Sequence, residues 1–132
     1  MSNLSRVLEH NSSTAPLAAE AEFTGTAALV VRHSMVTVFL HAEPSTADCT
    51  LYMEFSQDGI NWDRAITIPI TNPSAAAPHA LIPIAQYYRT RVVNGTTEQT
   101  VLRLQTIAHD QKSHSLVSRA AQSIGDYTDV QN

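Results

Sequence analysis

The stretch of the sequence best supplied with residues for chemistry is 56–63, SQDGINWD, which holds two carboxylates and the only tryptophan of the chain. Asp58 and Asp63 are of the type that serves general acid–base catalysis or calcium binding. An aspartate followed directly by a glycine is also typical of a tight turn, and a tryptophan behind such a turn can anchor it by packing on neighbouring strands. We therefore predict that Asp58, Gly59 and Trp62 have a structural role as turn and anchor.

The other residues that could act as catalysts or metal ligands are scattered. None of the histidines at 10, 33, 41, 79, 109 and 114 pairs at a spacing typical of a metal motif, and a chain with one cysteine contains no CxxC. Cys49 lies on the apolar side of its predicted strand, which indicates a buried thiol rather than a nucleophile. No GxSxG and no glycine-rich phosphate loop is present. The sequence predicts no catalytic residue, no metal site and no cofactor, and therefore a protein that is not an enzyme.

Arginines form the remaining polar cluster. Arg89 and Arg91 are two residues apart and share one face of their predicted strand, and Arg103 on the next strand is expected near them. One interpretation is a solvated face on which Glu54 or Glu98 is the partner. The other is an arginine ladder at a subunit interface, where planar guanidinium groups suit carboxylate partners.

Strands must position these residues, because apolar residues recur with a period of two through the middle of the chain. The segment 49–56 shows the pattern most clearly, with an apolar side and a wet side. Asn94 and Gly95 predict a tight hairpin turn between two strands. Residues 71–78 are small, uncharged and bounded by proline, which predicts a crossover between two sheets. Strands are expected at 27–33, 35–42, 49–56, 65–70, 87–93 and 100–108, and the first two of these could form one long bent strand.

These elements predict an antiparallel β-sandwich of six to eight strands, with an immunoglobulin-like or jelly-roll topology. The length of 132 residues suits one domain. We expect the sandwich at 20–108, an N-terminal arm at 1–19 and a C-terminal arm at 109–132. Each arm is predicted as a short helix or an extended segment whose apolar residues need a surface to bury against, on this chain or on a neighbour. The predicted partner-binding residues of the arms are Leu4, Val7, Leu8, Leu116, Val117, Ile124 and Tyr127.

Composition limits the class of protein. The net charge is −4 and the eight basic residues are scattered, of which only Lys112 is a lysine. A nucleic-acid module carries a basic stripe, so we expect no nucleic-acid partner. The sequence shows neither the apolar run of a signal peptide nor the roughly 18 apolar residues of a membrane span, so we expect a soluble protein made in a cytoplasm, with no membrane partner. A preference for arginine over lysine favours a protein that works through contacts.

Three motifs occur in order: FSQDGINWD at 55–63, YYRTRVVNG at 87–95 and LRLQT at 102–106. With the opening AEFTGTAALV at 21–30, this pattern resembles small β-sandwich proteins and domains in the virions of tailed bacteriophages, over about residues 20–108. The resemblance implies a structural part of a virion, such as a head decoration or cement protein, or a connector, fibre or tail adaptor. It also implies no enzyme, no cofactor and a homo-oligomer, often a trimer.

The resemblance leads to an expected function. We expect a virion protein, assembled in the bacterial host cytoplasm, that binds copies of itself and other virion proteins such as major capsid, tail or baseplate proteins. The short arms and the lack of a repetitive shaft favour a capsid or connector part over a complete fibre. The alternative is a carbohydrate-binding β-sandwich module, because sandwiches with loop aromatics often bind glycans. Aromatic residues make up 6% of the chain, which argues against that alternative.

Overall fold

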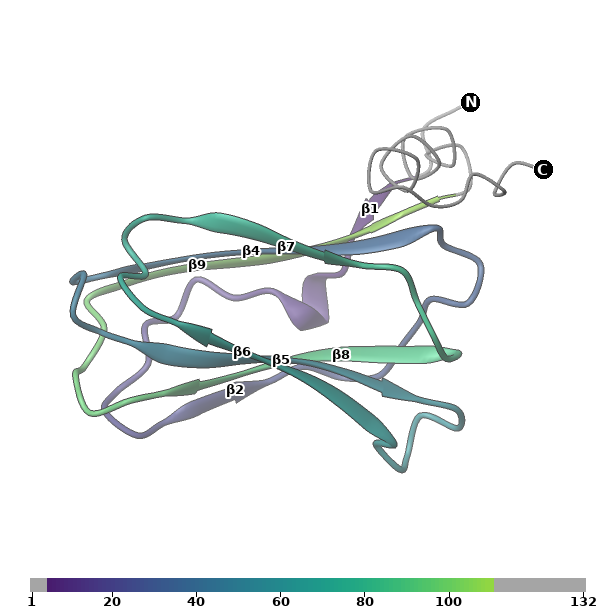
Figure 1. The fold of residues 1–132 in the computed structure, drawn as a ribbon, viewed down its shortest axis with the longest axis horizontal. Coiled ribbons are helices and arrows are strands. Elements are labelled where there is room, and N and C mark those ends of the chain that lie inside the picture. The colour runs from purple at the N-terminus through teal and green to yellow at the C-terminus, as the bar shows by residue number, and fades with distance from the viewer. Residues whose placement is uncertain (1–4, 111–132) are drawn as a thin grey trace, which may run out of the picture.

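The computed structural model describes residues 5–110, which form two antiparallel β-sheets packed face to face (Figure 1). The predicted β-sandwich is confirmed, and the described residues contain no α-helix. One short 3-10 helix, η1, precedes most of the strands. The elements are β1 Arg6–Val7, η1 Glu9–Asn11, β2 Glu22–Thr24, β3 Ala28–Leu29, β4 Met35–Glu43, β5 Cys49–Ser56, β6 Arg64–Ile70, β7 Ala77–Leu81, β8 Tyr87–Asn94 and β9 Val101–His109.

The strand order differs between the two layers. One sheet has the order β1-β9-β4-β7 and forms the upper layer in Figure 1. The other has the order β2-β8-β5-β6, with β3 also paired to β8, and forms the lower layer. The segment 71–76 joins β6 to β7, which lie in different sheets, so the predicted crossover is confirmed. The strand β7 follows this crossover and was not predicted, because Pro78 and His79 break any alternation of apolar residues.

Two sequence predictions about connections are wrong. The segments 27–33 and 35–42 do not form one bent strand, because β3 pairs in one sheet and β4 in the other. The strands β8 and β9 do not form a hairpin, because they too belong to different sheets and residues 95–100 cross between the layers. Loop lengths and turn residues of this kind are compatible with either connection, since both need a surface turn with small polar residues.

The core lies between the sheets and follows the predicted alternation. Along β5, Cys49, Leu51, Met53 and Phe55 all point inward and are buried. In β4, Val36, Val38, Leu40 and Ala42 do the same from the facing layer. Burial of apolar surface on this scale is the main stabilising contribution to a small sandwich.

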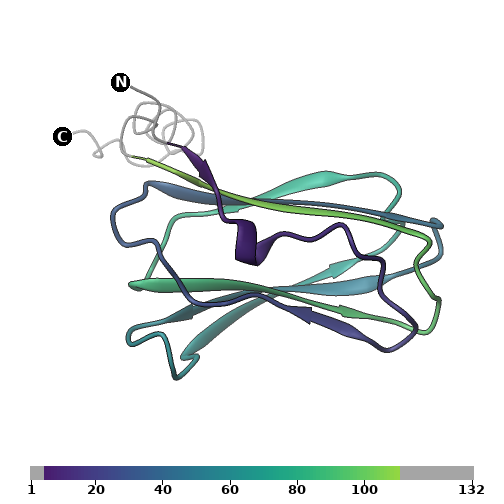
Figure 2. The same cartoon turned by 180° about the vertical axis from the view of Figure 1, so that it is seen from behind.

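The N-terminal strap, residues 5–17, runs along one side of the sandwich between the two layers (Figure 2). It is held to the four-stranded sheet by pairing of β1 with β9 and by a bridge between Ser13 and Leu104. Its hold on the five-stranded sheet is the side chain of Asn11, which is 1% exposed. The Asn11 Oδ1 accepts the backbone N–H of Thr90 at 2.7 Å, and its Nδ2 donates to the carbonyl oxygen of Thr26 at 2.9 Å.

A buried chain of hydroxyl groups continues from the strap across the core. The Thr106 hydroxyl donates to the backbone oxygen of Asn11 at 2.7 Å. That leaves the Thr90 hydroxyl to donate to Thr106 at 2.9 Å, and the Tyr88 hydroxyl to donate to Thr90 at 2.6 Å. Burial raises the pKa of the Tyr88 hydroxyl, so it stays a donor. The Cβ of any larger residue at Gly25 would lie 2.0 Å from the Asn11 Oδ1, so this position must be glycine for the strap to seat.

Candidate functional site: an arginine–glutamate face on the five-stranded sheet

The outer face of the five-stranded sheet carries a cluster of charged and aromatic side chains, the arginine–glutamate face. It comprises Tyr52 and Glu54 of β5, Trp62 of the following turn, and Arg89 and Arg91 of β8. The register of β5 and β8 places Glu54 opposite Arg89 and Tyr52 opposite Arg91. Side chains opposite each other on one face of a sheet are in contact distance, so the pairing of these two strands determines the cluster.

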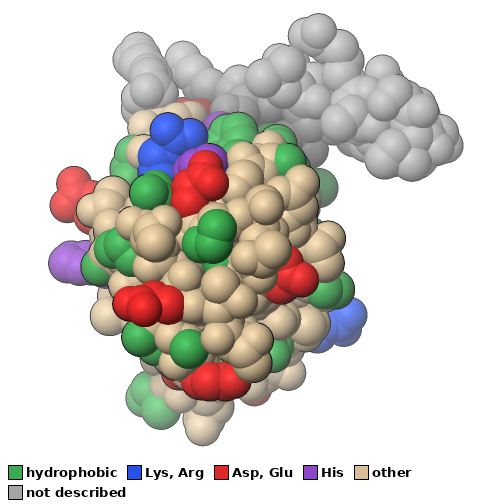
Figure 3. Space-filling view, turned by 90° about the vertical axis from the view of Figure 1, so that its left-hand side faces the viewer, with side chains coloured by type: hydrophobic (Ala, Val, Ile, Leu, Met, Phe, Trp, Pro, Cys, Tyr) green, Lys and Arg blue, Asp and Glu red, His purple; other side chains and the backbone are tan. Residues whose placement is uncertain are grey.

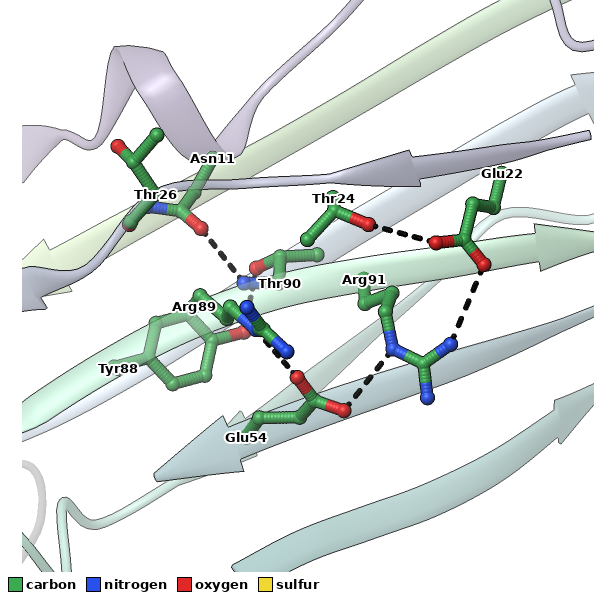
Figure 4. Close-up of polar contacts among 9 residues, drawn as sticks. All are labelled: Asn11, Glu22, Thr24, Thr26, Glu54, Tyr88, Arg89, Thr90 and Arg91. Atoms are coloured by element: carbon green, nitrogen blue, oxygen red, sulfur yellow. Dashed lines mark hydrogen bonds and ion pairs between the residues drawn. The ribbon is translucent and has the colours of Figure 1, made fainter. Parts of the chain in front are cut away.

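Glu54 lies at the centre of this face and bridges the two arginines (Figure 4). Arg89 Nε donates to its Oε1 at 2.6 Å, and Arg91 Nε donates to its Oε2 at 3.0 Å. Glu54 is only 5% exposed although it points away from the core, because the arginine side chains cover it. Both carboxylate oxygens therefore have a charged donor, which offsets the cost of removing a carboxylate from water.

A second carboxylate extends the network along the face. Glu22 of β2 lies 3.5 Å from Arg91 Nη1 and also accepts a hydrogen bond from the Thr24 hydroxyl at 3.0 Å. Partial burial disfavours the charged form of Arg91, but the hydrogen bond and charge of Glu54 and the charge of Glu22 raise its pKa above the ordinary value. Arg91 is thus held as a cation with a fixed orientation.

Each arginine also stacks on an aromatic ring. The Cζ of Arg89 lies 4.4 Å from the ring centroid of Trp62, and the Cζ of Arg91 lies 4.1 Å from that of Tyr52. Such cation–π contacts contribute about 0.5–1 kcal/mol each at exposed sites. One face of each ring is covered by a guanidinium group and is not open to a sugar ring. The Nη atoms of Arg89 make no hydrogen bond within residues 5–110, so they remain available to an incoming acceptor.

The turn after β5 is built around Asp58. Its Oδ1 accepts the backbone N–H groups of Ile60 and Asn61, each at 2.8 Å, and the hydroxyl of Ser56 at 3.0 Å. The N–H groups of Asn61 and Ile60 hold the pKa of Asp58 far below its usual range. Gly59 follows with a φ of +78°, which a glycine adopts without strain.

Asp63 contributes to the same turn from its other end. Its Oδ2 accepts the backbone N–H of Gln57 at 3.1 Å, so the donors of the turn engage both aspartates of the motif. The described residues contain no group of three His, Cys, Asp or Glu side chains arranged to hold a metal ion. The hydrogen bonds of Asp58 and Asp63 order this turn, which places the Trp62 ring beside the Arg89 guanidinium group.

Arg103 does not join Arg89 and Arg91. It lies in β9 of the other sheet, opposite His41 of β4, and points away from the sandwich on the far side. The prediction that the three arginines share one surface is therefore wrong, and it fails because the expected hairpin of β8 and β9 does not form. Of the two predicted partners, Glu54 is the one that binds Arg89 and Arg91.

Asn94 and Gly95 also have a role other than the one predicted. Gly95 does not have the positive φ that a type I′ turn requires. Asn94 is buried, and its Nδ2 donates to the carbonyl oxygens of Leu17, Ala18 and Thr97. It therefore holds the end of the N-terminal strap against β8.

The predicted arm residues fall into three groups. Leu8 is 3% exposed in the core of its own chain, which corrects the prediction that it docks on a partner. Val7 lies in β1 and is 40% exposed. The others lie outside the described residues: Leu4, Leu116, Val117, Ile124 and Tyr127.

Two residues with central roles were not predicted as such. Asn11 carries no signal in the sequence, since a polar residue near a terminus is usually solvated. Glu54 was named only as one of two possible partners, and the alternation along 49–56 placed it on the wet side of β5. Cys49 is buried, and burial, aided by the charge of Asp48, raises the pKa of its thiol to about 11.

Comparisons with known proteins give a family and a fold. Residues 1–109 match the family described as "Uncharacterised protein YqxG N-terminal domain". A comparison with curated protein sequences finds no match. No helix among residues 5–110 has the length and apolar character to cross a membrane.

Several solved structures share the fold. The crystal structure of the PBSX exported protein XepA has a TM-score of 0.63 and 20% identity, over 83% of this chain and 39% of XepA. The chain therefore spans well under half of XepA. A Bacillus endospore appendage structure, described as a family of disulfide-linked pili, has a TM-score of 0.53 and 13% identity, over 81% of this chain and 87% of that one. A Cellvibrio mixtus carbohydrate-binding module in complex with cellotriose has a TM-score of only 0.42 and 12% identity, over 82% and 98%, which is too distant to carry an argument.

Proposed function

The chain belongs to the family of the YqxG N-terminal domain, and from this membership and its arginine–glutamate face we propose that it is a non-enzymatic structural domain of a phage-derived particle. In the finer form of the proposal, it is a decoration or cement protein or a connector or fibre adaptor of a tailed-phage virion. It binds neighbouring subunits and copies of itself through its outer faces. The context comes from the family resemblance of its motifs and from the shared fold of XepA, a PBSX exported protein.

The observation that carries the proposal is the composition and rigidity of the arginine–glutamate face. Tryptophan, tyrosine and arginine are the residues most enriched in the energetic centres of protein interfaces. Here both guanidinium groups are already fixed by Glu54 and by an aromatic ring. A surface that is ordered before its partner arrives loses less conformational entropy on binding. The free Nη atoms of Arg89 suit a carboxylate on the partner.

The test is to recover particles from a culture that produces this chain and to measure whether the chain is bound to them. A Thr67→Glu variant places a negative charge on the exposed side of β6, opposite Tyr52, without removing any member of the network. The matched control is Thr96→Glu, which adds the same charge at an exposed threonine outside this face. We expect Thr67→Glu to reduce the bound amount at least tenfold and Thr96→Glu to leave it unchanged. Equal binding of both variants, or no binding of the wild type, contradicts the proposal.

A glycan array separates this proposal from the carbohydrate-binding alternative. Because guanidinium groups cover one face of the Trp62 and Tyr52 rings, we expect no glycan signal above background. A reproducible signal that is lost in a Trp62→Ala variant would favour the alternative.

A further inference from the structure

On the half nearest the described termini, the outer surface of the four-stranded sheet carries no Asp, Glu, Lys or Arg. We name this surface the outer apolar face. The strand register aligns Val7, Ile107, Thr37 and Ala80 in one row across all four strands. The remaining members flank that row: Met35, Phe39, Pro78, Gln105 and His109, whose Nε2 lies 3.1 Å from the Thr37 hydroxyl. This is the upper surface of the upper layer in Figure 1.

An apolar surface in this place requires an explanation. An antiparallel sheet of a sandwich normally buries one face and presents polar residues on the other. The five-stranded sheet follows that rule, with arginines, glutamates and threonines outside. On the four-stranded sheet, by contrast, Phe39 is 41% exposed and Val7 is 40% exposed. Contiguous exposed apolar surface of this kind marks interaction sites.

We propose that the outer apolar face is where a second copy of this chain docks, sheet against sheet. This inference rests on the proposed structural function and names one of its contact surfaces. The face supplies no Asp, Glu, Lys or Arg, so a self-pairing across a two-fold axis brings no like charges together. Two sheets that pack face to face lie about 10 Å apart, a spacing at which side chains of the two faces interdigitate.

Charge elsewhere on the chain favours this face for contact with another copy. The net charge of −4 makes copies repel one another. Figure 3 shows the end of the sandwich away from the described termini, with several acidic side chains on its surface. The sequence places four acidic residues in or beside the connections at that end, namely Glu20, Glu43, Asp48 and Glu98. Contact between copies at that end is disfavoured, whereas contact at the outer apolar face removes uncharged surface from water.

The area of the face limits the area that two copies can bury against each other. At strand spacings of about 4.8 Å and rises of about 3.3 Å, the four strands cover about 320 Å² in projection over the rows of Met35–Phe39. The accessible surface is larger, because side chains stand out from the sheet, and about 600 Å² per partner is the lower bound of a standard specific interface. We therefore expect a reversible dimer that forms in the micromolar range. Phe39 is its main anchor, since it is the one aromatic side chain on the face.

The experiment is sedimentation equilibrium of the purified full chain over a range of concentrations. We expect the mass to rise toward that of a dimer, and Phe39→Ser to weaken dimerisation at least tenfold. Ala80→Glu, which places like charges opposite each other across the contact, is expected to do the same. The matched control is Ile60→Ser, which removes a 77% exposed isoleucine from the tip of the 57–63 turn and should leave the mass unchanged. Circular dichroism confirms that each variant is folded.

Every other outcome overturns the inference. A monomer at all concentrations, a trimer, or a dimer that Phe39→Ser and Ala80→Glu leave intact would show that this face does not bind a second copy. A monomeric wild type in which Phe39→Ser abolishes binding to particles would assign the face to a different protein. None of these outcomes bears on the Thr67→Glu experiment, so failure of the inference and failure of the proposed function are distinguishable.

Discussion

Replacing Glu54 by glutamine tests whether the arginine–glutamate face is a fixed network. The substitution keeps the size of the side chain and removes its charge. One oxygen of the carboxylate becomes an amide nitrogen, so one arginine Nε–H then faces a donor instead of an acceptor. The other arginine keeps an acceptor, but without the charge. Both guanidinium groups lose their counter-ion at the centre of the face.

The expected loss of stability is worked from the two hydrogen bonds. Bonds to charged groups contribute about 1.5–3 kcal/mol each. The side chains of Arg89 and Arg91 are 24% and 25% exposed, so water replaces part of each interaction in the variant. The amide oxygen keeps one of the two bonds as a neutral bond of about 1 kcal/mol, so the variant loses one charged bond and weakens the other. Taking the lower end of the range for both, we expect Glu54→Gln to lower the free energy of unfolding by about 2–3 kcal/mol. Glu22 is 50% exposed and 3.5 Å from Arg91, so Glu22→Gln should cost no more than about 0.5 kcal/mol.

The assay is urea unfolding followed by fluorescence and by circular dichroism. The single tryptophan, Trp62, lies under Arg89, so its emission reports on the network as well as on the fold. Circular dichroism reports the global transition independently. If Glu54→Gln loses less than about 0.5 kcal/mol, or no more than Glu22→Gln, the buried carboxylate does not stabilise the face and the argument for its rigidity fails.

Three further predictions concern the strap, the core thiol and the turn. Asn11→Ala removes the acceptor of the buried Thr90 N–H and should lower stability by about 2–3 kcal/mol in thermal or urea unfolding; a loss within 0.5 kcal/mol would mean that the strap does not hold the sheets together. Cys49, with its thiol pKa raised to about 11 and its side chain buried, should react with a maleimide at pH 8 only in denaturant, and rapid labelling of the native chain would contradict its burial. The pKa of Asp58 is lowered on folding, so the carboxylate stabilises the fold fully above the ordinary aspartate value of about 4 and loses this contribution as the pH falls below it. The difference in melting temperature between the wild type and Asp58→Asn should therefore shrink between pH 5 and pH 2, and a constant difference would refute the role of the charge.

The sequence predicted the core better than the surfaces. A period of two identifies the two sides of a strand, and along β5 it correctly assigned the buried apolar side. The same pattern placed Glu54 on the outer side of β5. Its side chain does point outward, but it is buried rather than exposed to solvent. Whether an outward side chain is covered depends on long side chains from a neighbouring strand, here Arg89 and Arg91. That information lies in the strand pairing, which a single alternating segment does not contain.

The connection between β8 and β9 shows the same limit at the level of topology. An asparagine–glycine pair between two strands favours a hairpin, yet these strands lie in different layers. Asn94 is instead buried, and its amide group donates to the carbonyl oxygens of Leu17 and Ala18 in a distant segment as well as to that of Thr97 in its own connection. A local signal fails when a side chain that usually serves its own turn is recruited by a distant segment. Because the hairpin was predicted, Arg103 was expected beside Arg89 and Arg91, although it lies in the other sheet.

The N-terminal strap shows why a segment that the sequence predicts as an arm can be part of the core. The strand β2 ends at Thr24 and β3 begins at Ala28, so a bend interrupts the pairing along β8 next to Thr90. The Thr90 N–H would be buried there without a partner, at a cost of about 1–3 kcal/mol. The side chain of Asn11 fills this position as a backbone carbonyl would, and its own backbone oxygen accepts from Thr106 of the other sheet. The strap thus completes both sheets at one side of the sandwich.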